Sequence, residues 1–165
     1  MIFTHNIIKN IDILEKVDFK ELKELYLSLN KISNIEVLKN VKFKELEILN
    51  LRNNKISEIK CIDQFKFEKL KILELGVNKL SQINILQNAN FRHLKELYLS
   101  VNDISDISAL EGFKFEELEI LDLSSNKISD INILEKVNFK NLKELILNDN
   151  NISDIKVLEN IKFKK

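Results

Sequence analysis

Residues 22–45 read LKELYLSLNKISNIEVLKNVKFKE, and stretches of the same length and pattern follow along the chain. The complete units begin at leucines 24 residues apart: Leu22, Leu46, Leu70, Leu94, Leu118 and Leu142. An asparagine keeps the same spacing: Asn6, Asn30, Asn54, Asn78, Asn102, Asn126 and Asn150. A polar residue fixed at the period of an apolar frame is typical of a solenoid of stacked repeats. We therefore predict a single array over residues 1–165, with a partial repeat at 1–21 and six 24-residue repeats at 22–165.

The leucines in the first part of each unit alternate with other residues. In the first complete unit, Leu25 and Leu27 alternate with Glu24, Tyr26 and Ser28. A period of two predicts a short strand with one buried face and one exposed face. Strands that recur after each return segment stack side by side in parallel, because every repeat runs in the same direction. The predicted fold class is thus an α/β solenoid with a parallel sheet.

The second part of each unit carries apolar residues three positions apart, such as Ile32, Ile35, Leu38 and Val41. This spacing suits a 3₁₀ turn or a short helix with one apolar stripe. A serine recurs just inside this segment, and we expect it to cap the turn by accepting a backbone N–H: Ser33, Ser57, Ser81, Ser105, Ser129 and Ser153. We expect the recurring phenylalanine to form a buried column between repeats: Phe19, Phe43, Phe67, Phe91, Phe115, Phe139 and Phe163.

The recurring asparagine comes three residues after the second strand leucine, at the turn that leaves the strand. Its amide carries both hydrogen-bond donors and an acceptor, so it is able to satisfy backbone groups of its own loop and of a neighbouring repeat. Loss of such a buried bond costs about 1–3 kcal/mol. A catalytic asparagine is not needed in every repeat, and we interpret these residues as a structural ladder.

The composition argues against several classes of partner and location. Lys and Arg together number 26, as do Asp and Glu, so the basic excess of a nucleic-acid binder or a polybasic membrane anchor is missing. No apolar run approaches the ~18 residues that a membrane span needs. Cys61 is the only cysteine, so we expect no disulfide framework and a cytoplasmic protein. The absence of proline favours one continuous array.

The pattern of residues 22–38, LKELYLSLNKISNIEVL, resembles the short-repeat class of the leucine-rich repeat family, LxxLxLxxNxIxxIxxLxxLxx. Bacterial internalins and a regulatory subunit of protein phosphatase 1 belong to that class. The resemblance covers the whole chain, with two extra residues per unit around the phenylalanine. It implies a right-handed superhelix with the parallel sheet on its concave face and short 3₁₀ or helical segments on its convex face. It also implies protein recognition, usually through the concave face.

Members of this family usually carry a capping segment at each end of the array, and this chain departs from that pattern. It begins inside a unit, with Met1 and Phe3 at the positions of strand leucines, and it stops at the end of a unit. The last repeat is expected to expose Leu142, Leu145, Leu147 and Phe163. Terminal repeats need a polar outer face for solubility. The sequence therefore predicts either a fragment of a larger protein, whose activity lies in a missing domain, or a homo-oligomer formed through uncapped ends.

The side chains that alternate with the strand leucines line the face that we predict binds a protein partner. These candidate residues are Tyr26, Ile48, Asn50, Arg52, Ile72, Glu74, Glu96, Tyr98, Ile120 and Asp122. Exposed aromatic and branched side chains ringed by charge suit an anchor for a partner. The acidic rim favours a partner rich in Lys or Arg, chiefly through its association rate. The structural alternative is that isoleucine and tyrosine simply favour strands.

The sequence offers no constellation for catalysis. Cys61 occupies a column that is otherwise apolar, and His5 and His93 fall at unrelated positions of distant units. There is no zinc-ligand spacing and no glycine-rich phosphate loop. Pairs of carboxylates such as Glu74 and Glu96 follow from the high acidic content, and glycosidase-like chemistry would need a cleft. We predict a non-catalytic scaffold without cofactor or metal, with a self-assembling structural module as the alternative.

Overall fold

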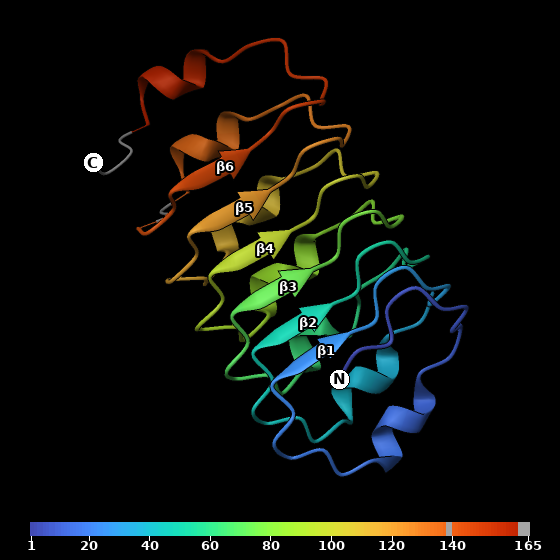
Figure 1. Ribbon diagram of the computed structural model, residues 1–165. Helices are drawn as coiled ribbons and strands as arrows, with labels where there is room; N and C mark the ends of the chain where they lie inside the picture. Colours follow the sequence, from blue (N-terminus) through green and yellow to red (C-terminus); the bar gives the residue numbers. More distant parts are fainter. Residues whose placement is uncertain (138–139, 162–165) are drawn as a thin grey trace.

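The strands of successive repeats form a parallel sheet. The computed structural model describes residues 1–137 and 140–161. The strands pair in the order of the sequence (Figure 1): β1 (Glu24–Tyr26), β2 (Ile48–Asn50), β3 (Ile72–Glu74), β4 (Glu96–Tyr98), β5 (Ile120–Asp122) and β6 (Glu144–Ile146). The register between neighbours is one repeat, so that Leu73 lies beside Leu49 on one side and Leu97 on the other. The predicted parallel sheet of a solenoid is confirmed.

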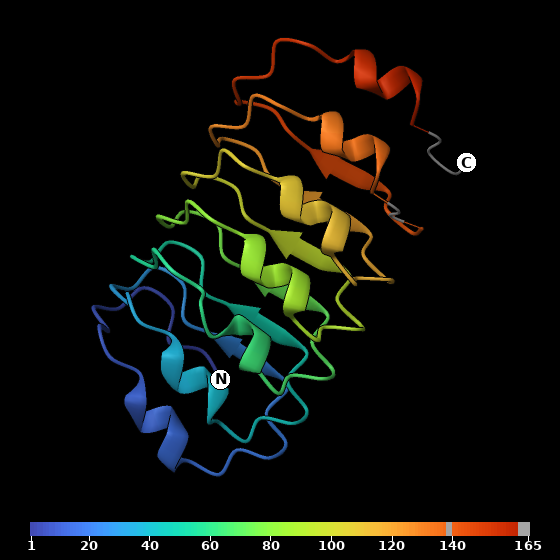
Figure 2. The ribbon, with the colours of Figure 1, turned by 180° about the vertical axis from the view of Figure 1, so that it is seen from behind.

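The return segments form short 3₁₀ helices on the opposite side of the molecule from the strands, as Figures 1 and 2 show. Their bounds are η1 (Asp12–Lys16), η2 (Glu36–Lys39), η3 (Ile62–Gln64), η4 (Asn84–Asn88), η5 (Ser108–Gly112), η6 (Asn132–Glu135) and η7 (Lys156–Glu159). Residues three apart fall on the same side of a 3₁₀ helix, and Ile35 and Leu38 are accordingly both buried. The predicted 3₁₀ segments are confirmed.

Where a side chain caps one of these turns, it is not the predicted serine but the residue after it: Asn34, Asp106, Asp130 and Asp154. Asn34 Oδ1 accepts a hydrogen bond from the backbone N–H of Glu36 at 2.8 Å. Asp106 Oδ1 accepts in the same way from Ser108 at 2.8 Å. The prediction was wrong because an Asn or Asp side chain reaches the N–H two residues on and closes the turn itself. The serines point into solvent instead: Ser33, Ser57, Ser81, Ser105, Ser129 and Ser153.

The core lies between the sheet and the helices and runs through the whole array. The inward leucines of β1 to β5 are all buried. The phenylalanine column is buried at Phe43, Phe67, Phe91 and Phe115, and the rings of Phe91 and Phe115 stack with centroids 6.4 Å apart. Phe19 is 41% exposed because it belongs to the first repeat and its far side meets solvent. Phe139 and Phe163 lie outside the described residues.

Each interior ladder asparagine joins its own repeat to the one before it. At Asn54, Nδ2 donates to the carbonyl oxygen of Leu51 in its own turn and to that of Leu27 one repeat earlier, both at 3.0 Å. Its Oδ1 accepts from the backbone N–H of Ile32 at 3.0 Å. The same bonds recur at Asn30, Asn78, Asn102, Asn126 and Asn150. At Asn6 the amide donates only to carbonyl groups of its own turn.

The residue before each ladder asparagine has a left-handed backbone. Its φ lies between 51° and 62° throughout the column: His5, Leu29, Asn53, Val77, Val101, Ser125 and Asp149. Such values are costly outside glycine, and most so for a β-branched residue such as Val101. The conformation turns the chain so that Leu29 and Val101 face solvent while the asparagines that follow them are buried.

Candidate functional site

The parallel register brings the ten candidate binding residues onto one surface, which we call the sheet face. Its first column is Glu24, Ile48, Ile72, Glu96, Ile120 and Glu144, and its second is Tyr26, Asn50, Glu74, Tyr98, Asp122 and Ile146. Arg52 follows β2 and lies beside the second column. All ten candidates are partly exposed. Adjacent strands lie ~4.8 Å apart, so the columns form a continuous surface.

Acidic side chains gather around Tyr98 at the centre of the sheet face. The phenol of Tyr98 donates a hydrogen bond to Glu96 Oε2 at 2.9 Å. Glu74 and Asp122 occupy the same column on the two neighbouring strands. Burial raises the pKa of the Tyr98 phenol, and the bond to Glu96 and the nearby carboxylates raise it further. Tyr98 is therefore held as a neutral hydrogen-bond donor among carboxylates.

Glu74 is largely enclosed by its neighbours, with a side chain that is 16% exposed. Burial raises the pKa of this carboxyl group; Arg52 opposes the shift, and Asp122 and Glu96 add to it. Arg52 Nη1 lies 3.9 Å from Glu74 Oε2, which is too long for a hydrogen bond. Arg52 therefore neutralises Glu74 only weakly, and the centre of the sheet face keeps a surplus of negative charge.

Arg52 extends across the neighbouring strand because Gly76 leaves room for it. Its Nη1 lies 3.5 Å from Ser100 Oγ, one repeat beyond Gly76. A Cβ at Gly76 would lie 2.7 Å from Arg52 Nη1 and 3.2 Å from the carbonyl oxygen of Ser100. The sequence alone does not predict this support. The sequence feature that could have indicated it is Gly76, which stands in a column whose other members, such as Arg52 and Ser100, carry side chains.

Two candidate residues also hold the turns that follow their strands. Asn50 Oδ1 accepts from the backbone N–H of Arg52 at 3.0 Å. Asp122 Oδ1 accepts from the backbone N–H and the hydroxyl of Ser124, at 2.9 and 2.6 Å. The other polar atoms of these side chains, Asn50 Nδ2 and Asp122 Oδ2, make no hydrogen bond within the described residues.

Apolar side chains lie next to the acidic centre. Ile48 and Ile72 are adjacent on β2 and β3, and Ile120 lies on β5 beyond Glu96. Tyr26 stands at the start of the second column, where burial and then the nearby Glu24 raise the pKa of its phenol. The sheet face thus combines an apolar stripe with a cluster of carboxylates.

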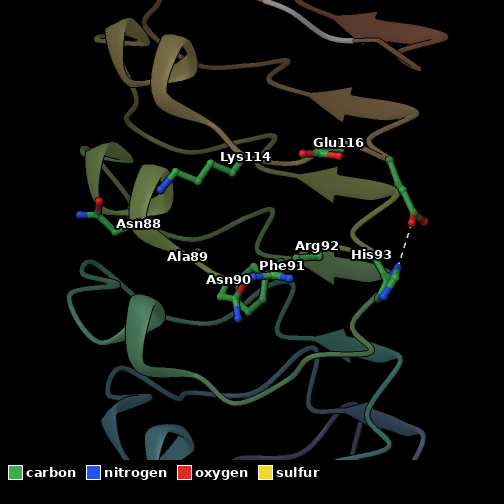
Figure 3. A pocket seen from close by; sticks show the side chains of 9 residues that line it. Asn88, Ala89, Asn90, Phe91, Arg92, His93, Lys114 and Glu116 are labelled. Carbon is green, nitrogen blue, oxygen red and sulfur yellow. Dashed lines mark hydrogen bonds and ion pairs between the residues drawn. The ribbon is translucent and has the colours of Figure 1, made fainter.

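A separate hollow of about 560 Å³ opens on the flank of the array, lined from the segments 88–93 and 114–117. Ala89 makes room for it, because the equivalent residues one repeat away are Phe65 and Phe113. His93 is labelled on the right of Figure 3. Its Nδ1 lies 2.9 Å from Glu117 Oε1. The nine residues that line the hollow include no serine, threonine or cysteine, so this pair has no hydroxyl or thiol nucleophile beside it.

The part of the chain that the structure describes also lacks a metal site and a reactive thiol. No three His, Cys, Asp or Glu side chains of residues 1–137 and 140–161 come together as a metal site. Cys61 is buried, and burial raises the pKa of its thiol, which disfavours the reactive thiolate. Among the described helices, none is long and apolar enough to cross a membrane.

Family models match three parts of the chain in the register of its strands. A model of two leucine-rich repeats matches residues 92–136, which hold β4 and β5. Models of a leucine-rich repeat match residues 45–65 and 140–155, which hold β2 and β6. The chain is a leucine-rich repeat protein. A comparison of this leucine-rich repeat protein with curated proteins gave no match.

Solved structures share its fold. An internalin (inlF) from Listeria monocytogenes is 27% identical with a TM-score of 0.68, over 93% of this chain and 48% of that one. The functional domain of InlJ from Listeria monocytogenes is 25% identical with a TM-score of 0.66, over 98% and 32%. The plant peptide hormone receptor RGFR1, in complex with RGF2, is 26% identical with a TM-score of 0.71, over 98% and 26%.

The leucine-rich repeat protein spans about half the length of the first internalin and a smaller share of the other two chains. The fold that it shares with them is typical of domains that bind other proteins. The likeness therefore shows a fold of that class, in a chain that spans only part of each neighbour's length.

Proposed function

We propose that this leucine-rich repeat protein is a non-catalytic scaffold that binds a protein partner through the sheet face. The observation that carries the proposal is a continuous surface in which partly exposed isoleucines and tyrosines adjoin weakly neutralised carboxylates. Side chains of this kind give a partner apolar area to bury without disturbing the core. The similarity to a receptor solved in complex with RGF2 supports a binding role of the same general kind.

The partner that fits this surface presents Lys or Arg. Glu74, Glu96 and Asp122 lie around Tyr98, while the nearby base, Arg52, is 3.9 Å from the closest carboxylate oxygen. A cationic side chain from a partner would complete this neutralisation and speed the encounter. The adjacent Ile48 and Ile72 suit the aliphatic stem of the same side chain.

The proposed activity is binding without a reaction. The His93–Glu117 pair on the flank has no hydroxyl or thiol among the residues that line its hollow, and the carboxylates of the sheet face are partly exposed side chains that alternate with structural leucines. We also propose a cytoplasmic location, because Cys61 is the only cysteine and the chain therefore has no disulfide framework.

Affinity capture followed by identification of the retained protein tests the proposal. The wild-type chain is compared with a double variant, Ile72→Ser with Tyr98→Ser, which removes two anchors and leaves the inward leucines in place. Both side chains are partly exposed, so the variant should keep its fold. For the purified partner we expect Kd to rise at least ~30-fold, or about 2 kcal/mol.

A matched control is Val101→Asp, because Val101 is an exposed apolar residue on the turn after β4. Capture and affinity should be unchanged in this variant. The pair Glu74→Gln and Asp122→Asn should slow association with the partner and weaken its dependence on salt. Wild-type affinity in the folded Ile72→Ser, Tyr98→Ser variant would rule out the sheet face as the binding site.

A further inference from the structure

Tyr98 lies at the centre of the sheet face with a carboxylate on each side of it along the array. In the register of the sheet, Glu74 on β3 and Asp122 on β5 stand directly beside Tyr98 on β4. Adjacent strands are ~4.8 Å apart, so the backbone positions of the two carboxylates lie about 10 Å apart, with the tyrosine between them. Ile72 and Ile120 add apolar surface in the neighbouring column of the same two strands. An aromatic side chain therefore stands between two acids, next to apolar groups.

The hydroxyl group of Tyr98 holds its ring in place on this face. It donates to Glu96 Oε2 at 2.9 Å, and that glutamate lies two residues earlier on the same strand and the same side of the sheet. The tyrosine side chain is partly exposed. The electron-rich face of such a ring attracts a cation that lies within ~6 Å of its centroid. A cation from a partner therefore gains from the ring as well as from the acids.

Each of the three carboxylates around the ring retains an oxygen without a hydrogen-bond donor within the described residues. Glu74 makes no hydrogen bond there, although its side chain is only 16% exposed, because Arg52 Nη1 stays 3.9 Å from its Oε2. Asp122 uses Oδ1 for the backbone N–H and the hydroxyl of Ser124 and leaves Oδ2 unbonded. Glu96 uses Oε2 alone, for the phenol. A mostly enclosed carboxylate without a donor is unfavourable, so the cluster is suited to a donor that carries positive charge.

We propose that the sheet face binds an arginine side chain of the partner, stacked on the Tyr98 ring with its N–H groups directed to Glu74 and Asp122. This inference rests on the proposed function and names the partner residue at the centre of the surface. A guanidinium is planar, stacks on aromatic rings and carries five N–H donors in a fork, so a single group is able to reach carboxylates on two sides. A lysine ammonium is a compact and strongly hydrated charge that lacks this geometry. The site therefore selects arginine over lysine.

Arg52 shows how a guanidinium lies against this surface. Its side chain crosses Gly76, and Nη1 comes within 3.5 Å of Ser100 Oγ and 3.9 Å of Glu74 Oε2. These contacts are long and the arginine side chain is 43% exposed, so it offsets the negative charge without using the carboxylate oxygens. Arg52 therefore competes weakly with an incoming arginine, and its removal should strengthen the binding of that arginine.

Amide chemical shifts of the isotope-labelled 165-residue chain, titrated with N-acetyl-arginine methylamide, test the proposal. The lysine analogue keeps the positive charge without the planar fork, and the citrulline analogue keeps the planar group without the charge. We expect shifts that cluster at Tyr98 and at its neighbours on β3 and β5. Kd for the arginine probe should be at least ~3-fold lower than Kd for the lysine probe, and the citrulline probe should not bind.

Variants locate the site, and the same spectra show whether each of them is folded. Tyr98→Leu should raise Kd for the arginine probe about 3- to 5-fold because it removes the ring, whereas Tyr98→Phe should keep the preference for arginine. Glu74→Gln and Asp122→Asn should each raise that Kd about 3-fold, and Arg52→Gln should lower it. The control is Val101→Ser, which changes an exposed residue on the turn after β4 without adding charge and should bind the probe like the wild type.

Equal Kd values for the arginine and lysine probes would overturn the inference and indicate a diffuse acidic surface. An unchanged Kd in folded Tyr98→Leu, or no shift at the solubility limit of the arginine probe, would overturn it as well. The captured partner separates this inference from the proposed function. Binding that needs the sheet face but survives replacement of every partner arginine by lysine would sink the arginine site alone. Capture that is unaffected in the folded Ile72→Ser, Tyr98→Ser variant would sink the proposed function, and the arginine site with it.

Discussion

The interior repeats and the last repeat contain the same kinds of residue in different surroundings. Leu97 of β4 and Leu99 just after it are fully buried, whereas Leu145 of β6 and Leu147 just after it are partly exposed. The residue types, the strand and the turn are the same at both places. What differs is whether a repeat lies on each side. A repeat in this protein therefore completes its core only by contact with its neighbours, and stability is a property of the joints.

The largest difference in stability between interior and end repeats is expected in the phenylalanine column. Phe67→Ala should lower the free energy of unfolding by about 3–5 kcal/mol, because the ring is fully buried. Phe19→Ala should cost only about 1 kcal/mol, because that ring is 41% exposed. Urea denaturation followed by circular dichroism measures both losses. Equal losses at the two positions would contradict the difference between interior and end.

The asparagine ladder gives the next largest effect. Asn102→Ala should cost about 2–3 kcal/mol, because it leaves the N–H of Leu80 without an acceptor in a buried joint and removes one of the two bonds to the carbonyl of Leu75, which keeps the bond from Asn78. Asn6→Ala should cost less than about 0.5 kcal/mol, because that amide is exposed and bonds only within its own turn. Amide hydrogen exchange at Leu80 should rise in the first variant alone. Unchanged exchange there would count against the ladder as a tie between repeats.

The cost of the left-handed backbone conformation should be the same in an interior repeat and in the last repeat, because it arises within a single residue. Val101→Asn should raise the free energy of unfolding by about 1 kcal/mol, because asparagine tolerates a φ of 54° better than a β-branched residue does. Asn53→Val in the interior and Asp149→Val in the last repeat should each lower it by a similar amount. Thermal unfolding of the three variants provides the measurement. A clear difference between Asn53→Val and Asp149→Val would show that neighbours also influence this turn.

The smallest effects concern two carboxylates with opposite responses to pH. Burial raises the pKa of Glu74, whereas the backbone N–H of Ser108 lowers the pKa of Asp106. Glu74→Gln should therefore stabilise the fold at neutral pH, and the gain should shrink as pH falls through the raised pKa. Asp106→Asn should destabilise it, and that loss should shrink as pH falls through the lowered pKa. Urea unfolding at a series of pH values would disprove the assignment if both variants responded with the same sign.

The strands and the 3₁₀ segments could be predicted from the sequence because each position is repeated along the chain. A single unit such as residues 22–45 leaves helix and strand ambiguous at several places. In the repeated columns, the alternation of Leu49 with Ile48 and Asn50 returns in the neighbouring units and fixes which side chains face inward. The same alternation locates the sheet face, because the outward columns follow once the inward leucines are known.

Features that depend on adjacent residues or on several repeats at once could not be predicted. Ser33 and Asn34 both favour turns, and only the backbone geometry shows that the asparagine makes the cap. The sequence gives no sign of the left-handed turn where leucine or valine occupies it, because these residues ordinarily avoid that conformation. The position of Arg52 depends on Gly76 and Ser100, which lie one and two repeats further on. The proposed binding of a partner rests on sheet-face residues that change from unit to unit.

The uniform register of the sheet has a consequence for how such a gene can change. Every strand pairs with residues 24 positions away, and every interior ladder asparagine makes the same bonds to the repeat before it. Duplication or loss of a whole unit keeps each of these partners aligned, whereas an insertion of a few residues shifts one side of a joint against the other. Such an array can lengthen or shorten in evolution by whole repeats, and each change adds or removes one strand of the sheet face.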